Sequence, residues 1–326
     1  MIYDNTAAIP RQELAAVLVQ GRGLNDQNIG LQVLPEYGVT RRSAHLLQMT
    51  VAASELLRIM DKIVEPGGDI ERVTLTFGDT VLTLAIRKEE IEIPDEVELD
   101  YADYFSVEAV GSQIGEDKLE LTMELLVANA VFNTTTFGSA VNSAVAYTNA
   151  LLATISFVAD VYTAIEGVRN KGESPNTIVI PALVYQRIRQ APLVVNFIRG
   201  NLQRQADVNM NTIQQAFADE GITKVLVGRS RYNSAPKGAT PIYTKIWPVT
   251  FIWVGRTGDT FSADEGGIET IQGAGATLYW ESYGGLFQID TYRHEPRESN
   301  IVRAKTSGVP YIANPNAGYL IATQYS

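Results

Sequence analysis

The segment from Gly172 to Pro192, GESPNTIVIPALVYQRIRQAP, places a buried strand directly before a helix. A Ser-Pro-Asn turn leads into the run TIVI, which is β-branched throughout, as interior strands often are. Pro181 follows, and proline at the first position of a helix loses no N–H that the helix needs. Because Ile178 and Ile180 lie two residues apart, they share one face of the strand and Val179 takes the other. We therefore expect all three side chains to be buried, with helices covering both faces.

The chemistry that a ligand at this strand–helix junction would need is missing from the sequence. A glycine-rich phosphate loop does not follow the strand, and the chain has no cysteine to act as nucleophile or metal ligand. The two histidines, His45 and His294, are isolated and belong to no HExxH pattern, and GxSxG is absent. The residues therefore favour a structural role over catalysis, and we expect no catalytic residue, cofactor or metal site.

The net charge of −11 is concentrated in one part of the chain. Between Glu89 and Glu124 there are thirteen acids and one base, a net charge of −12, which leaves 24 acids against 25 bases elsewhere. A nucleic-acid-binding protein is expected to carry a basic stripe, and the sequence shows none, so we do not expect tight sequence-specific binding of DNA or RNA. Signal-peptide features and apolar runs of membrane-spanning length are also missing, so no membrane contact is expected.

The acidic stretch has three interpretations. Carboxylate pairs such as those among Glu90, Glu92 and Asp95, or Asp100 with Asp103, would suit glycoside hydrolysis or a divalent metal. A glycosidase cleft is also expected to hold tryptophan near its acids, and the three tryptophans lie far away in the sequence. The acids could instead be solvated. The third interpretation is that part of the stretch, Glu89 and Glu92 above all, faces arginines of a neighbouring subunit, with Arg41, Arg42, Arg72 and Arg229 as candidates.

Residues 44–90 predict a long antiparallel ribbon with little apolar surface. Polar and apolar residues alternate from Arg72 to Phe77, and the alternation continues through 82–86 and on to Ile93. Isolated hairpins are marginally stable in water, so this arm needs a second surface, and a neighbouring subunit is the simplest one. The turn sequence VEPGGD marks its tip. The residues of the tip expected at such an interface are Lys62, Glu65, Pro66, Gly67, Gly68 and Arg72.

Helical spacing predicts one long helix over Ser106–Phe132, with Ile114 and Leu121 on its apolar face. Gly111 and Gly115 weaken the start of this helix. Further helices are predicted at 158–168, 181–190 and 212–218, and further strands at 224–227, 249–254, 276–283, 286–293, 301–305 and 318–321. Together these elements describe an α+β chain.

The order of these elements resembles the major capsid proteins of tailed bacteriophages, whose Hong Kong 97-type capsid fold is shared with encapsulins. Residues 29–39, IGLQVLPEYGV, are similar to the N-terminal arm of that fold, and residues 91–97, IEIPDEV, to the strand before its spine helix. The stretch AIEGVRNKGESPNTIVIPALVYQRIRQAP resembles a helix and core strand of its axial domain, while ITKVLVGRSRYNSA and NAGYLIATQ resemble later strands. The resemblance covers nearly the whole chain.

This resemblance implies four parts. They are an N-terminal arm (1–43), an extended loop (44–90), a peripheral domain with a long spine helix (91–143 and 259–326), and an axial domain with a central sheet (144–258). On this division Ile178, Val179 and Ile180 belong to the axial-domain core, and the strand–helix junction builds a rigid plate that requires no ligand.

The resemblance also implies a function. The chain would assemble as pentamers and hexamers into the icosahedral head of a tailed phage, in the cytoplasm of the host bacterium. Its partners would be other copies of itself, portal, scaffolding or cement proteins, and packaged double-stranded DNA touched only non-specifically. Two alternatives stay open: the shell of an encapsulin-like compartment that holds cargo protein, and an acid-rich hydrolase.

Overall fold

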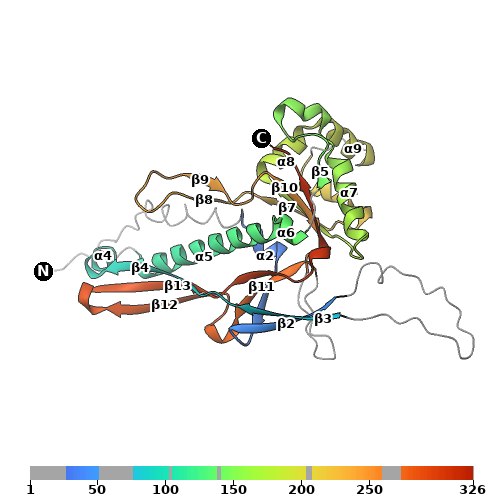
Figure 1. Cartoon of the computed structure of the whole chain (residues 1–326). Helices are drawn as coiled ribbons and strands as arrows, with labels where there is room; N and C mark the ends of the chain where they lie inside the picture. Colours follow the sequence, from blue (N-terminus) through green and yellow to red (C-terminus); the bar gives the residue numbers. More distant parts are fainter. Residues whose placement is uncertain are drawn as a thin grey trace, which may run out of the picture.

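The computed structural model describes residues 27–50, 76–102, 105–137, 141–202, 208–258 and 273–325. Figure 1 shows two parts. In one, helices surround a five-stranded sheet; in the other, a long helix lies along a three-stranded sheet. The α+β class expected from the sequence is confirmed.

The five-stranded sheet contains the strand that begins at Thr177. In spatial order its strands are β5 (Val141–Asn142), β15 (Gly318–Ala322), β10 (Phe251–Gly255), β6 (Thr177–Pro181) and β7 (Lys224–Gly228). Strand β6 runs parallel to β7 and antiparallel to β10, which is the middle strand. The sheet is therefore mixed, with β6 flanked by a partner on each side.

Both faces of this sheet are covered. One face packs against the helices α7 (Phe157–Arg169), α8 (Ala182–Gln190), α9 (Pro192–Leu202) and α10 (Met210–Ala216). Ile178 and Ile180 lie in the cluster on that face, and Val179 lies in the cluster on the other face with Trp253 and Trp247. All three β6 side chains are fully buried, which confirms the burial expected from their spacing.

Pro181 is the residue before the first turn of the helix and not, as the sequence suggests, the first helical residue. It is the last residue of β6 and the N-cap of α8, with φ −63° and ψ 144°. The ring fixes φ near this value in either position, and the extended ψ keeps Pro181 paired with Gly228 in the sheet.

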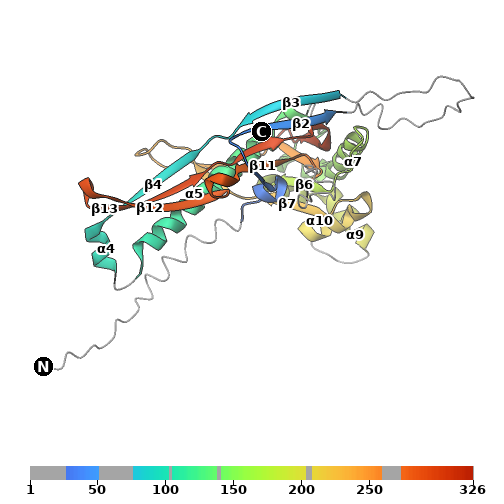
Figure 2. The same ribbon diagram turned by 90° about the horizontal axis from the view of Figure 1, so that it is seen from below.

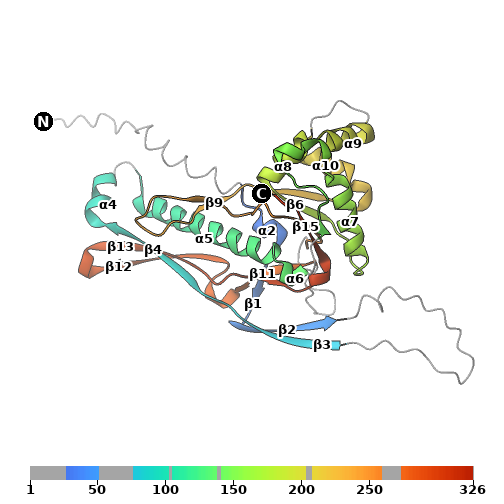
Figure 3. The same ribbon diagram turned by 45° about the horizontal axis from the view of Figure 1, so that its top comes forward.

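The long helix is α5 (Val107–Val131), and Ser106 caps it by accepting a hydrogen bond from the Ala109 N–H at 3.2 Å. It lies along an antiparallel sheet whose strands, in order, are β12 (Phe287–His294), β13 (Ser299–Thr306) and β4 (Arg87–Pro94). Figure 3 shows this arrangement. We call this sheet and α5 the peripheral unit.

The apolar stripe predicted for α5 is wrong in its first half. Ile114 is 44% exposed and Lys118 is also exposed, whereas Gly111 and Gly115 are buried against the sheet. A Cβ added at Gly115 would lie 2.8 Å from the Ala304 Cβ. The two glycines that weaken the helix in isolation are therefore what lets its backbone approach β13 closely.

The alternation at Ile91 and Ile93 suggested that β4 continues the ribbon, and this prediction is wrong. Strand β4 pairs along its whole length with β13, and Asp95 then begins the short helix α4 (Asp95–Tyr101). The ribbon itself is formed by β2 (Ser43–Thr50) and β3 (Thr76–Thr83), paired antiparallel with Ser43 opposite Thr83. It points away from the end of the molecule that carries α4 (Figure 2).

Two strands of the five-stranded sheet come from stretches that the expected division places in the peripheral domain. β15 pairs with β10, and β5 pairs with β15 in turn. The division into four parts stays a proposal.

The strand predicted at 276–283 is present as β11 (Gly275–Trp280), and most of the other remaining elements were not expected as such. A small sheet joins β1 (Glu36–Val39), β11 and β14 (Val309–Ile312), and a hairpin joins β8 (Arg231–Asn233) and β9 (Tyr243–Lys245). Two one-turn helices are α2 (Gly30–Val33) and α6 (Thr134–Phe137). Short 3-10 helices cover Asn149–Thr154, Ala218–Glu220, Glu281–Tyr283, Glu295–Arg297 and Pro315–Ala317. Across the described ranges, each helix is too short or too polar to cross a membrane.

Candidate functional site

The acids of β4 lie beside basic residues of the β12–β13 hairpin. Glu90 is directly opposite Arg303 in the register of β4 and β13, and Arg303 Nε donates a hydrogen bond to Glu90 Oε1 at 2.8 Å. The hydroxyl of Tyr292, on β12, donates to the same oxygen at 3.2 Å. Opposite charges placed across a ladder in this way stabilise the pairing of the strands.

Glu89 and Glu92, expected to face arginines of a neighbour, each have a basic partner in their own chain. Lys118 of α5 forms an ion pair with Glu89. Glu92 accepts hydrogen bonds from Arg297 Nη1 at 2.9 Å and from the Ser299 hydroxyl at 3.2 Å. The sequence could not show this, because both partners of Glu92 lie more than 200 positions further along the chain.

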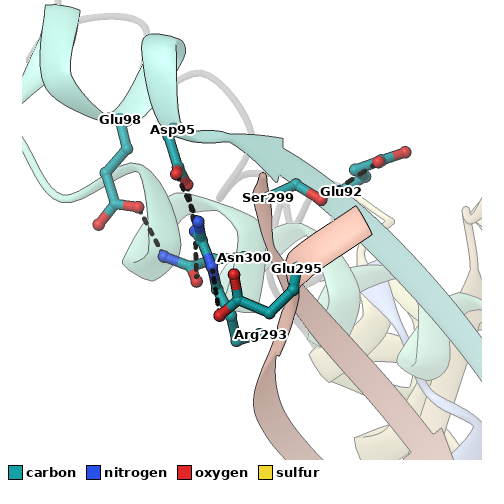
Figure 4. A network of polar contacts seen from close by, with 7 residues as sticks. All are labelled: Glu92, Asp95, Glu98, Arg293, Glu295, Ser299 and Asn300. Atoms are coloured by element: carbon teal, nitrogen blue, oxygen red, sulfur yellow. Dashed lines mark hydrogen bonds and ion pairs between the residues drawn. The ribbon is translucent and has the colours of Figure 1, made fainter. Parts of the chain in front are cut away.

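The first turn of α4 is held by the same hairpin (Figure 4). Arg293 donates to both carboxylate oxygens of Asp95, and the second of these bonds, from Nη2 to Oδ2, measures 2.6 Å. The side-chain amide of Asn300 donates to Glu98 at 2.7 Å. These contacts give the acidic stretch a second role, which is to dock α4 onto the end of the peripheral sheet.

The ion pairs argue against the hydrolase interpretation. The hydrogen bond from Arg303 holds the pKa of Glu90 below its ordinary value, and the bond from Arg293 does the same for Asp95. A general acid in glycoside hydrolysis needs a raised pKa, so these two carboxyls are shifted the wrong way. Groups of acids and histidines arranged to hold a metal ion are also absent from the described ranges.

The other residues named from the sequence fall into two groups. Lys62, Glu65, Pro66, Gly67, Gly68 and Arg72 lie outside the described residues. Of the candidate arginines, Arg42 donates to the Leu84 carbonyl at 3.3 Å, and Arg229 is exposed at the base of the β8–β9 hairpin. Arg41 is exposed, and Arg72 lies outside the described residues. Within the described residues, none of Arg41, Arg42 and Arg229 forms an ion pair with the acidic stretch.

Sequence reasoning missed a buried carboxylate on the long helix α5. Glu124 of α5 is only 2% exposed. Its oxygens accept hydrogen bonds from the Ile29 N–H at 3.0 Å, from the Gly30 N–H, and from the Trp247 ring N–H. It thereby fastens the residues before β1 and the segment after β9 to the same point of α5.

Burial raises the pKa of Glu124, and the hydrogen bonds from Trp247, Ile29 and Gly30 oppose that rise. Close packing accompanies the hydrogen bonds, because a Cβ at Gly30 would lie 2.6 Å from Glu124 Oε2. One signal was available: Glu124 falls within LTMELLVANAV, where apolar residues precede and follow it at helical spacing. An acid on an apolar helix face must find donors, since an unpaired buried charge is very costly.

The comparisons with known proteins agree with this architecture. No family model matches the chain. In sequence, the chain is 23% identical over 249 residues to a protein named major capsid protein from Burkholderia phage BcepMu, which covers 74% of each chain. In structure, it is similar to a phage-related protein from Bordetella bronchiseptica, with a TM-score of 0.65, 16% identity and coverage of 95% of this chain and 96% of the other.

A second solved structure carries the word capsid in its description. The capsid structure of cyanophage P-SCSP1u matches with a TM-score of 0.53 and 11% identity, over 90% of this chain and 87% of that one. The structural likenesses establish the fold, and the sequence relative points to the same class of protein. The chain thus has the Hong Kong 97-type capsid fold, and it is similar in sequence to a protein named as a phage major capsid protein.

Proposed function

We propose that copies of this chain assemble as pentamers and hexamers into the icosahedral head that encloses a tailed-phage genome. The observation that carries the proposal is the agreement in fold with phage proteins over at least nine-tenths of the chain, with a major capsid protein as sequence relative. Copies of one chain that contact each other through different faces can close into rings, which a shell built from capsomers requires.

The ribbon β2–β3 supports assembly through an arm. Two strands alone are marginally stable, and no third strand extends this ribbon within the described residues. A neighbouring copy would supply the missing surface. The loop tip named from the sequence, Lys62 to Gly68 with Arg72, stays part of this proposal.

The partners beyond other copies follow the same proposal. They are portal, scaffolding or cement proteins, and packaged double-stranded DNA touched without sequence specificity. The shell would form in the cytoplasm of the host bacterium, and the chain would have no enzymatic activity. No observation favours an encapsulin-like compartment over a phage head.

Negative-stain microscopy and size-exclusion chromatography of the purified protein test the proposal. We expect capsomers or closed hollow particles. The proposal would be contradicted if the protein remained monomeric at every salt and protein concentration, and that result would favour the hydrolase alternative.

Deleting residues 60–71 and joining the ends with a short turn tests the arm. We expect a folded, soluble subunit whose circular dichroism and Tm resemble those of the wild type, and which forms no shells. Normal particles from this variant would show that assembly does not depend on the loop tip.

The acidic inter-subunit face needs one adjustment. Glu89 and Glu92 already have bases in their own chain, so a neighbour would have to compete for them. Other acids of α4 and α5 have no ion-pair or hydrogen-bond partner for their carboxylates within the described residues: Glu96, Asp100, Glu108 and Glu116. We place the proposed face on these four acids.

A further inference from the structure

The hairpin formed by β8 and β9 has a charge pattern that its own chain does not balance. Residues 221–258 contain no aspartate or glutamate. Four bases lie on the hairpin or next to it: Arg229, Arg231, Lys237 and Lys245. Across the described part of the chain, none of the four forms an ion pair.

The register of the hairpin places two of these bases directly opposite each other. Arg231 of β8 pairs with Lys245 of β9, so both side chains stand on the same face. Like charges directly opposite in a ladder are destabilising, and a two-stranded hairpin has little stability to lose. A partner that supplies negative charge to this face would remove the repulsion.

Apolar surface accompanies the charge. Tyr243 is 73% exposed and stands on the face of Arg231 and Lys245, two residues before Lys245 on β9. Ile242, next to it, is 59% exposed. Tyrosine and arginine are enriched at protein–protein interfaces, so the hairpin combines a basic face with residues suited to burial.

The complementary surface exists on the same protein. α4 carries the unpaired acids Glu96 and Asp100, and between them Leu99 is 77% exposed and Val97 is 39% exposed. Acids interleaved with exposed apolar side chains match a hairpin whose bases are interleaved with Tyr243 and Ile242. Duplex DNA would supply the negative charge but offers no apolar counterpart to these two side chains, so the combination favours a protein partner.

We propose that the β8–β9 hairpin of one copy docks on α4 of a second copy. The contact is heterologous, because a basic hairpin of one subunit meets an acidic helix of the next, and such contacts close into rings. The hairpin extends from the five-stranded sheet in the direction of α5 (Figures 1 and 3), which leaves its tip free of the sheet's own helices. This inference rests on the proposed self-assembly and names one interface within it.

Charge exchange tests the contact. In the hairpin variant, Arg231→Glu is combined with Lys245→Glu, which leaves like charges opposite each other and so disturbs the hairpin itself little. In the helix variant, Glu96→Lys is combined with Asp100→Lys. We expect each variant to fold with the Tm of the wild type, and to lose assembly by about tenfold or more, because reversed charge turns attraction into repulsion at the contact.

The combination of both variants has the net charge of the wild type, and we expect it to restore particles. A matched control joins the hairpin variant to Asp219→Lys and Glu281→Lys, two exposed acids elsewhere, and we expect no rescue. The inference would be overturned if the hairpin variant assembled as the wild type does. It would also be overturned if the combined variant failed to restore particles, or if the control restored them equally well. Normal particles that retain less DNA would overturn it in favour of a DNA contact. Failure of the wild type itself to assemble would instead refute the proposed function.

Discussion

Two strands of this protein end in the same way and lie in opposite environments. β6 ends at Pro181 and β4 ends at Pro94, and both prolines cap a following helix with φ −63° and nearly equal ψ, 144° and 145°. Every residue of β6 is buried, whereas Ile93 is the one buried residue of β4. Proline therefore determines the local change from extended chain to helix, and the residues before the proline determine whether the strand is buried or exposed.

The comparison also separates two means of stabilising a strand. β6, with the sequence TIVIP, is stabilised by apolar burial on both faces. β4, with RKEEIEIP, is stabilised by its ladder with β13, by ion pairs such as Glu90 with Arg303, and by the close contact of α5 through Gly115. Charge changes should therefore have very different effects in the two strands.

Val179→Asp in β6 should have the largest effect. The side chain is fully buried among apolar residues, so the substitution buries an unpaired charge and costs several kcal/mol, enough to prevent folding. Lys88→Asp in β4 is the matched control, since Lys88 is exposed and lies opposite another base, Lys305. Soluble expression and circular dichroism distinguish the two; a folded Val179→Asp protein would show that β6 is not a core strand.

Glu124→Gln should cause the next largest loss of stability. All groups that surround this carboxylate donate hydrogen bonds, so the amide of glutamine would place a donor against donors. Leaving one such buried group unsatisfied costs about 1–3 kcal/mol, which urea unfolding can measure. Glu92→Gln on the exposed face is the control, with an expected loss of only ~0–1 kcal/mol. Equal losses from the two variants would show that the burial of Glu124 does not matter.

The pKa of Glu124 adds a pH signature to this comparison. Because the folded pKa is raised above its ordinary value of 4.5, the stability contributed by this group is present below that value and is lost as pH rises through the folded pKa. Glu124→Gln removes the titration, so the difference in stability between variant and wild type should be larger at pH 4 than at pH 7. A difference that grows with rising pH would contradict the direction of the shift.

A pair of glycine substitutions compares a helix position in close contact with a strand and a helix position with free space around it. Gly115→Ala brings a Cβ within 2.8 Å of the Ala304 Cβ and should destabilise the protein by about 1–3 kcal/mol through overpacking. Gly200→Ala, in α9, meets nothing within 4 Å and should stabilise the protein by about 0.5–1 kcal/mol. Opposite shifts in Tm are expected, and a stabilising Gly115→Ala would mean that α5 can move away from β13.

The sequence predicted the elements whose residues act locally. The β-branched run TIVI before a proline identified β6, and the helical spacing found α5 to within one residue at each end. The burial of Ile178 and Val179 on opposite faces followed from the alternation of a strand. Each of these depends on neighbours in sequence, and none needed knowledge of a distant partner.

The sequence could not show which distant residues and strands contact each other. Helical spacing of the large apolar residues predicts a stripe that includes Ile114, whereas Gly111 and Gly115 are the residues that pack against the sheet in this half of α5. β4 was assigned to the ribbon because alternation does not say which strand lies opposite. The sequence leaves three interpretations of the acids open, because the arginines that pair with Glu90 and Glu92 follow more than 200 residues later and Lys118, the partner of Glu89, lies on a different element.

The smallest effect should come from the ion pair at the start of α4. Arg293 holds the pKa of Asp95 below its ordinary value of 3.8, so this contribution to stability is present above that value and is lost as pH falls through the folded pKa. Asp95→Asn should lower Tm slightly at pH 7, and by less as pH is lowered towards 2 and the folded carboxyl takes up its proton. Glu96→Gln is the control, because Glu96 shares the first turn of α4 without a partner in the described chain, and we expect no change at either pH. If both variants lowered Tm equally, the effect would belong to the helix terminus and not to Arg293.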